Sequence, residues 1–501
     1  MNPKLLKSRV QECLWRVAEA DDAILSATLA GSFVEEATLE GVSDIDLILV
    51  VDHLDRERFA RWVSAFDSAL RGELAACGYG LRINPTLGPL KFNDPATAVL
   101  HLMLYSRAAH VEHAIASPFT CFDWQRSTVH CKRSLAAVFP VFNLQPHHFM
   151  SARRGVREYL RDFHAHVVSY RELDCTADGY HEVKCTKAMN VRDRHEFAYH
   201  VMRFLMQNLV KLVRRANLAL RGETLLGEYF LIFPEREPET RRLFKALRTM
   251  KRRGDFSEPL ADLDRELPAF VDGFEAQFRR RFFTEATRHV AFRHGPTLLN
   301  RAAGQERVFL GRSDPPLAEI DAQAWQSLVE QLAEVPPAAA YTSPLLRCRQ
   351  SLAAVAERCP LPALTCDERL REIDYGALEG LTVASSRATH GGLFAAWERG
   401  EDPKFPGGEN SRDVAQRALA FACHHWQSAP GHSVTCTHNV VLRCLVGHVL
   451  GLEPHEWHRL EVPHLAPITF VATREHGLFV DIPTATARVM FQDFATLSKA
   501  A

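Results

Sequence analysis

Two groups of residues, far apart in the chain, have side chains suited to chemistry. In the C-terminal half, the apolar run Val290–Phe292 leads directly into Arg293, His294 and Gly295. A neutral imidazole is a nucleophile, a guanidinium stabilises phosphoryl oxygens, and glycine lets a substrate approach the backbone closely. This run therefore suits nucleophilic attack on a phosphoryl group, although a match of three residues is weak by itself.

The second group lies near the N-terminus, where Gly31 and Ser32 precede Asp44, Asp46 and an apolar run that ends at Val51. Side chains alternate between the two faces of a strand, so both carboxylates are predicted on one face. Two carboxylates can hold Mg²⁺, and a Gly-Ser turn leaves room for a triphosphate. We expect a helix to end at the Gly-Ser pair and a strand to carry the aspartates.

Further segments follow His294 in a fixed order. They are FLGRSDPPLAEI, YTSPLLRCRQSL, DERLREIDYGALEGLT, FPGGEN and VTCTHNVVLRCLVGHVLGL. Together with the Arg-His-Gly run, these segments make residues 289–482 closely resemble the histidine phosphatase superfamily. The resemblance implies an α/β fold of the phosphoglycerate-mutase type.

The resemblance implies catalytic roles for the matching residues, namely the nucleophile His294, the phosphate-binding Arg293 and Arg347, the second histidine His438, the proton donor Glu372 and the family's common asparagine at Asn300. Guanidiniums and a neutral imidazole can serve a loose transition state, so this domain is expected to need no cofactor. Pro296 and Asn439 depart from common family residues and bear on substrate fit. The short spacing between the two histidines favours a phosphatase, whereas the DYGALEG segment keeps a mutase as the alternative.

The N-terminal group resembles the DNA-polymerase-β-type nucleotidyltransferase superfamily over residues 29–51. The resemblance implies that Gly31 and Ser32 contact a triphosphate and that Asp44 and Asp46 bind Mg²⁺. A third carboxylate is usual on a later strand, but the candidate strand at 98–106 presents His101 and no acid. Three possibilities stay open: another acid completes the site, His101 takes the place of the third carboxylate, or the domain binds a nucleotide without turnover. The nearby acids are Glu73, Asp94 and Glu112.

Three zones must position these groups, which makes the chain multidomain. Residues 1–148 alternate short apolar runs with helical patterns and are assigned to an α/β nucleotidyltransferase-like domain. Residues 149–287 are predicted to be a helical domain that completes the nucleotide or acceptor pocket, with an apolar stripe from Phe197 to Ala216 and Gly222 as its stop. Residues 288–501 are assigned to the α/β phosphoglycerate-mutase-like domain.

The middle zone is locally basic. Its Arg and Lys residues gather in the segments 153–161, 211–215 and 245–253. Solvated helix faces are the favoured explanation, and a surface that faces the phosphates of a nucleotide or polynucleotide is the alternative. No interleaved aromatic pattern points to RNA in particular.

The amino-acid composition limits which other classes of protein this chain could belong to. Of the 501 residues, 47% are apolar and 24% are charged, which supplies several cores and argues against disorder. The 60 Lys and Arg balance the 61 Asp and Glu, so no overall field favours nucleic acid. No apolar run is long enough for a membrane span, and the 12 Cys contain no CxxC pair. We therefore expect a cytoplasmic protein with reduced thiols and no membrane partner.

The sequence thus predicts a bifunctional enzyme. One site hydrolyses a small phosphorylated metabolite through a phosphohistidine, and the other transfers a nucleoside monophosphate from an NTP to an acceptor. Two alternatives stay open: a phosphatase regulated by an inactive nucleotide-binding module, and an enzyme that processes nucleic-acid ends, which the near-neutral charge disfavours. The sequence specifies neither base, acceptor, phosphoester nor oligomeric state.

Overall fold

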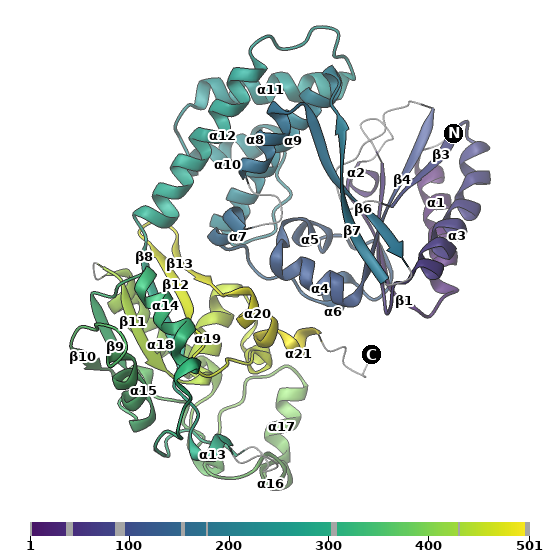
Figure 1. Ribbon diagram of the computed structural model, residues 1–501. Coiled ribbons are helices and arrows are strands. Elements are labelled where there is room, and N and C mark those ends of the chain that lie inside the picture. Colours follow the sequence, from purple (N-terminus) through teal and green to yellow (C-terminus); the bar gives the residue numbers. More distant parts are fainter. Residues whose placement is uncertain are drawn as a thin grey trace. The chain divides into compact units, whose positions relative to one another are not determined.

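The computed structural model describes residues 3–36, 44–85, 96–151, 156–176, 179–301, 308–428 and 431–495. These residues form two compact units, whose elements are labelled in Figure 1. The first unit contains the described residues up to Leu144 and from His148 to Ala276, and the second contains Gln145–His147 and those from Gln277 onward. Among the helices in this part of the chain, none is both long enough and apolar enough to cross a membrane.

Up to Arg279 the chain forms a mixed sheet, a separate hairpin and many helices. The elements are α1 (Pro3–Glu19), β1 (Ile24–Ala30), α2 (Ser32–Glu35), β2 (Ile45–Val51), α3 (Arg56–Ala75), β3 (Gly80–Asn84), β4 (Thr97–Ser106), α4 (Arg107–Ala116), α5 (Pro118–Trp124), β5 (His130–Lys132), α6 (Leu135–Val138), α7 (Pro146–Ser151), α8 (Val156–His164), β6 (Val167–Thr176), β7 (Gly179–Ala188), α9 (Val191–Arg214), α10 (Gly222–Ile232), α11 (Glu237–Arg253) and α12 (Leu263–Arg279).

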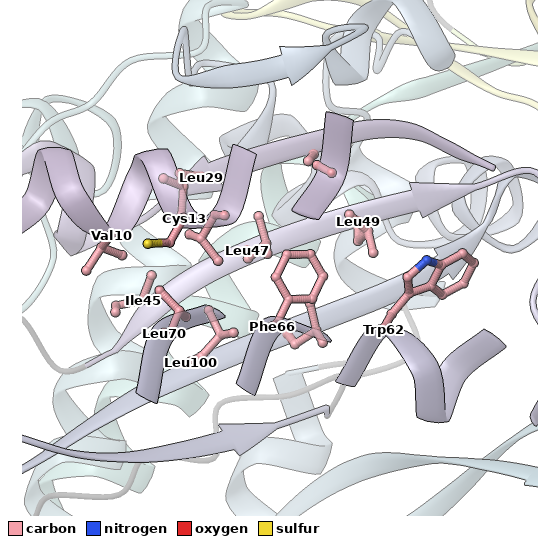
Figure 2. Close-up of a cluster of buried hydrophobic side chains, with 14 of the residues drawn as sticks. Val10, Cys13, Leu29, Ile45, Leu47, Leu49, Trp62, Phe66, Leu70 and Leu100 are labelled. Carbon is pink, nitrogen blue, oxygen red and sulfur yellow. The ribbon is translucent and has the colours of Figure 1, made fainter. Parts of the chain in front are cut away.

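The N-terminal sheet has the strand order β3-β4-β2-β1-β5, in which β2 is parallel to β4 and antiparallel to β1. Its core lies where Leu47 of β2 and Leu100 of β4 pack with Phe66 of α3 and with side chains of α1 (Figure 2). Alternate residues of a strand point to opposite faces. Asp46 of β2 and His101 of β4 therefore face away from this core.

A strand, rather than the predicted helix, leads into Gly31 and Ser32. β1 is almost entirely buried and pairs with β2 on one side and β5 on the other. Its Ala- and Leu-rich sequence fits either a helix or a strand, and pairing with two neighbours decides for the strand because it satisfies the backbone hydrogen bonds. Ser32 then opens the short helix α2, which Gly31 precedes.

The middle zone is not wholly helical either, because β6 and β7 form an antiparallel hairpin. Charged and polar residues occupy both faces of these strands, so the apolar period of two that would reveal them is missing. The stripe that begins at Phe197 is buried on α9, as predicted, but this helix ends at Arg214, with Arg215 in the left-handed conformation. Gly222 begins α10 instead of stopping α9.

Beyond Arg279 the chain forms a second sheet with helices around it. The elements are β8 (Thr287–Arg293), α13 (Leu298–Arg301), α14 (Gln326–Glu334), β9 (Ala339–Thr342), α15 (Leu346–Ala356), β10 (Leu364–Cys366), α16 (Val383–Thr389), α17 (Gly391–Glu398), α18 (Ser411–Ala422), β11 (Ser433–Thr437), α19 (Asn439–Leu450), β12 (Ile468–Thr473), β13 (Gly477–Asp481), α20 (Thr484–Met490) and α21 (Gln492–Ala495). Shorter helical turns lie between several of them. The apolar run Val290–Phe292 that leads into Arg293 lies on β8.

Candidate functional site

The second sheet brings three side chains to one edge. Its order is β10-β9-β11-β8-β12-β13, and β9, β11 and β8 are parallel neighbours. His294, Ser343 and His438 each come directly after one of these strands. The carboxyl ends of parallel strands meet at the same edge of a sheet, which is where α/β proteins bind ligands. The fold therefore gathers residues that are far apart in sequence.

His294 is buried and held in one tautomer. Its Nδ1 donates a hydrogen bond to the carbonyl oxygen of Gly295 at 2.7 Å, which leaves the lone pair on Nε2. The ring of His464 donates from Nδ1 to the carbonyl oxygen of His294 at 2.6 Å. Burial, followed by the charges of Arg347 and Arg293, holds the pKa of His294 well below its ordinary value. The imidazole is thus neutral and nucleophilic at Nε2 at neutral pH.

Arg347 lies against that nucleophilic nitrogen. It sits in the first turn of α15, is 1% exposed, and donates from Nε to His294 Nε2 at 3.2 Å. Its other nitrogens donate to the carbonyl oxygens of Ser313 at 2.6 Å and Gly311 at 2.9 Å. These bonds fix a positive charge where a phosphoryl group attacked by His294 would lie.

Arg293 and Arg443 supply two further guanidiniums. Arg293 donates from Nη1 to the carbonyl oxygen of Val462 at 2.9 Å, and Arg443 lies 3.7 Å from the carboxylate of Glu461. Burial lowers the pKa of Arg293 to about 10, so the group stays charged at neutral pH. The buried Nε atoms of both arginines have no hydrogen-bond partner within the described part of the chain. Unpaired buried donors of this kind favour an anionic ligand.

His438 faces His294 at the same sheet edge. The two ring centroids are 5.2 Å apart, and His438 is completely buried at the start of α19. Its Nε2 lies 2.8 Å from the hydroxyl of Ser343. Burial, with Arg347 as the next cause, holds its pKa well below the ordinary value. The structure therefore pairs two neutral imidazoles.

Glu372 is the buried acid of the site. Its Oε1 accepts hydrogen bonds from the backbone N–H of Ile373 at 3.0 Å and of Val440 at 3.2 Å. Burial raises its pKa, and the charges of Arg347 and Arg293 only partly oppose this effect. A carboxyl group with a raised pKa retains a proton to higher pH and can transfer it to a leaving group.

Replacing Glu372 with glutamine is expected to lower kcat/KM, which reports formation of the phosphohistidine, by about 10²-fold or more for alkyl phosphates and by less than about tenfold for p-nitrophenyl phosphate. An alkoxide needs a proton to leave, whereas nitrophenolate does not. Since burial raises the pKa of Glu372, kcat/KM for alkyl phosphates should fall as the pH rises through that pKa. Rates of both substrates across a pH series test this, and an equal loss for both would contradict it.

The remaining predicted residue, Asn300, lies on α13, but its side chain is outside the described residues. Sequence reasoning did not single out three side chains that the fold adds here: Ser343, Arg443 and His464. Ser343 stands inside the TSPLLR segment and Arg443 follows His438 on α19, so their positions gave a signal. His464 comes from a segment without a recognised motif and is brought in by pairing next to β8.

In the first unit, Asp44, Asp46 and His101 form a group. One ligand atom of each lies within 4.8 Å of the others. Asp46 and His101 are direct partners on the parallel strands β2 and β4, and His101 Nδ1 is 3.1 Å from Asp46 Oδ1. Carboxylate oxygens and an imidazole nitrogen fit a divalent cation such as Mg²⁺ or Mn²⁺.

Of the acids weighed as the third carboxylate, none joins this group of described residues. Glu73 lies on α3, 3.7 Å from Arg9, and Glu112 lies on α4. Asp94 lies outside the described residues. His101 therefore occupies the third place of the group.

Gly31 is required by the position of Asp46. A Cβ atom at Gly31 would lie 2.1 Å from Asp46 Oδ2, and the backbone has φ of +70°. Both facts exclude a side chain here, because L-residues rarely adopt this conformation and the carboxylate occupies the space. Gly31 and Ser32 line one cavity with Asp44 and Asp46, and their contact with a triphosphate stays a prediction.

Gly31→Ala is expected to weaken Mn²⁺ binding by about tenfold or more, because the added methyl group displaces the Asp46 carboxylate. Gly72→Ala is the matched control, since it lies inside α3 with no atom within 4 Å of its added Cβ. Calorimetric Mn²⁺ titration of both variants measures the effect. Unchanged affinity in Gly31→Ala would contradict the role assigned to this glycine.

The cavity that holds this group has a volume of about 1110 Å³ and lies within the first unit. Gly31, Ser32 and the Asp44–Asp46–His101 group form one part of its lining. Other parts come from β6, β7, α9 and the last turns of α11, with basic and aromatic side chains. The helices after the sheet thus enclose the same space as the predicted metal ligands.

Comparisons with known proteins concern the second unit. Residues 290–482 match the family model of the histidine phosphatase superfamily, branch 1. The 2,3-bisphosphoglycerate-dependent phosphoglycerate mutase 2 of Gloeobacter violaceus is 28% identical over 187 residues, which are 36% of this chain and 84% of that protein. The protein named "Probable phosphoglycerate mutase GpmB" of Klebsiella pneumoniae is 32% identical over 173 residues, which are 34% of this chain and 78% of that protein.

Similar solved structures include YhfR of Bacillus stearothermophilus, which is 28% identical, with 40% of this chain and 96% of that chain covered and a TM-score of 0.34. A mycobacterial glucosyl-3-phosphoglycerate phosphatase is 26% identical, with 39% and 98% covered and a TM-score of 0.33. The family model covers the His294 site from β8 to β13. Through residues 290–482, the chain belongs to the histidine phosphatase superfamily.

Proposed function

We propose that the second unit hydrolyses phosphomonoesters through a phosphohistidine intermediate. The observation that carries this proposal is the neutral His294, whose Nε2 carries the lone pair and accepts a hydrogen bond from Arg347 Nε at 3.2 Å, where a phosphoryl group would replace it. Attack forms an N–P bond and breaks the bond from phosphorus to the ester oxygen. Glu372 gives its proton to that oxygen, and the alcohol leaves.

Water completes the reaction. The Glu372 carboxylate takes a proton from water, whose oxygen attacks phosphorus and breaks the N–P bond. Inorganic phosphate leaves and His294 returns to its first state. A mutase would instead return the phosphoryl group to a hydroxyl of the bound substrate. Release of inorganic phosphate from phosphomonoesters, without exchange between hydroxyl groups, distinguishes hydrolysis from mutase activity.

We propose nucleotidyl transfer as the activity of the first unit. The supporting observation is the group formed by Asp44, Asp46 and His101, which shares a cavity with Gly31 and Ser32. These residues would hold Mg²⁺ or Mn²⁺, and a bound divalent ion neutralises phosphate charge during displacement at the α-phosphorus. The backbone at Gly31 would accommodate the triphosphate.

Pyrophosphate release from each NTP, in a mixture of metabolites with Mg²⁺, tests this second activity. Wild type should release pyrophosphate and Asp44→Asn should not. Binding of an NTP without turnover would instead support the nucleotide-sensing module. Salt-dependent binding of RNA, with extension or trimming of its end, would support nucleic-acid processing.

A further inference from the structure

The cavity of the first unit extends beyond the predicted metal ligands and the Gly31–Ser32 turn. Pockets for a single drug-sized ligand measure about 300–1,000 Å³, whereas this cavity measures about 1110 Å³. The metal-binding group and the Gly31–Ser32 turn account for only one part of its lining. The part formed by α9 and α11 contains none of the predicted metal ligands, and its side chains indicate the chemistry of a ligand that would fit there.

That part is cationic. Arg203 of α9 and Arg248 of α11 are half-buried in the lining, and no acidic partner for either lies among the described residues. Lys251 joins them from the next turn of α11, with its ammonium 5.3 Å from the centre of the Tyr199 ring. On α9 itself, the acid in the lining is Glu196, which is paired with Arg192 at 3.0 Å. The excess positive charge favours an anion.

Arg203 and Arg248 line the same cavity, and both are connected to the short stretch Leu220–Gly222. Arg203 donates from Nε to Gln207 at 3.2 Å, and Gln207 donates to the carbonyl oxygen of Leu220 at 2.8 Å. A Cβ atom at Gly222 would lie 2.5 Å from Arg248 Nη1, so glycine leaves the space that this guanidinium fills. Arg248 therefore packs against this stretch directly, and Arg203 is connected to it through Gln207.

The same stretch connects to the predicted triphosphate turn. Arg221 pairs with Glu35 and, at 2.6 Å, with Glu36, both at the end of the short helix that Ser32 opens. Leu220–Gly222 thus lies between the Gly31–Ser32 turn and the two guanidiniums. Arg203 and Arg248 are thus connected to the predicted reaction centre through this stretch, but they are not among the residues that form that centre.

We propose that Arg203, Arg248 and Lys251 bind the phosphate of a phosphomonoester acceptor, beside the bound NTP. This proposal rests on the nucleotidyl transfer proposed above. An acceptor hydroxyl forms a bond to the α-phosphorus, the bond to the β-phosphate oxygen breaks, and pyrophosphate and a proton leave. The product keeps its phosphomonoester, which is the class of group that the proposed phosphatase hydrolyses. In this order of reactions, nucleotidyl transfer comes first and dephosphorylation of its product comes second.

Calorimetric titration of the full chain with inorganic phosphate tests the site. Wild type should show two classes of phosphate site, because the His294 site also binds phosphate. Arg203→Gln/Arg248→Gln should lose one class, whereas Lys245→Gln, an exposed charge on α11 outside the cavity lining, should keep both. Arg203→Lys/Arg248→Lys should retain weakened binding, which separates loss of charge from loss of folding. A single class in wild type would overturn the proposal.

Saturating α,β-methylene analogues of the four NTPs distinguish an acceptor site from a triphosphate site. Phosphate should still bind at the second class of site when these analogues are bound. If the analogues abolish that class, the arginines hold the nucleotide's own phosphates and the proposal is wrong. Mn²⁺ and analogue binding would persist in that case, so the failure would leave the proposed nucleotidyl transfer standing.

Discussion

His294→Ala is expected to abolish the phosphomonoesterase activity, with kcat lower by about 10³-fold or more. The loss should be this large because the nucleophile itself disappears. Arg347 and Glu372 retain their hydrogen bonds to other backbone groups in this variant, so the site should stay folded. Phosphate release from p-nitrophenyl phosphate measures the rate, and this substrate does not depend on the proton from Glu372.

A labelling experiment isolates the intermediate. A radiolabelled phosphomonoester is mixed with the enzyme, which is then denatured in alkali. Label on wild type should resist alkali and be lost in acid, as for a phosphorylated imidazole, and it should be absent from His294→Ala. His424→Ala is the control. It removes an exposed histidine that is distant in sequence from His294, and it should label like wild type. Persistent label in His294→Ala would show that another residue accepts the phosphoryl group.

Asp46→Asn is expected to weaken Mn²⁺ binding to the first unit by about 10²-fold and to abolish pyrophosphate release from NTP. Asp46 is at the centre of the group because it contacts His101 and also lies against the backbone of Gly31. Its loss removes a charged ligand and leaves His101 without its partner. Electron paramagnetic resonance of free Mn²⁺ measures the affinity without reference to turnover.

Two further variants sharpen this test. Asp52→Asn removes an exposed carboxylate just beyond the same strand and should leave Mn²⁺ affinity unchanged. His101→Asp restores a third carboxylate and should shift the preference toward Mg²⁺, because Mg²⁺ favours oxygen ligands while imidazole suits transition metals. Equal Mn²⁺ affinity in Asp46→Asn and Asp52→Asn would remove the metal site from the proposal.

Local patterns in the sequence predicted those parts of both sites that lie on a single helix or strand. The buried apolar runs before His294 and His438 are β8 and β11. Asp46 lies on β2 and Asp44 directly precedes this strand, and the spacing of two residues places them together. These features follow from the chain's own periodicity, which does not depend on distant partners. The prediction of a helix before Gly31 was wrong because this segment does depend on distant partners: pairing with β2 and β5 makes it a strand.

The sequence by itself determined the residue types, their order and the faces that they occupy. Only the tertiary structure decided which distant residues join them. His101 completes the Asp44–Asp46 group because β4 pairs in parallel with β2 in one particular register. His464 reaches His294, and Arg203 and Arg248 are both connected to Leu220–Gly222, through contacts between elements that no local period encodes. Register and packing depend on the whole core, and a shift of one residue in the pairing of β4 with β2 would turn His101 to the opposite face.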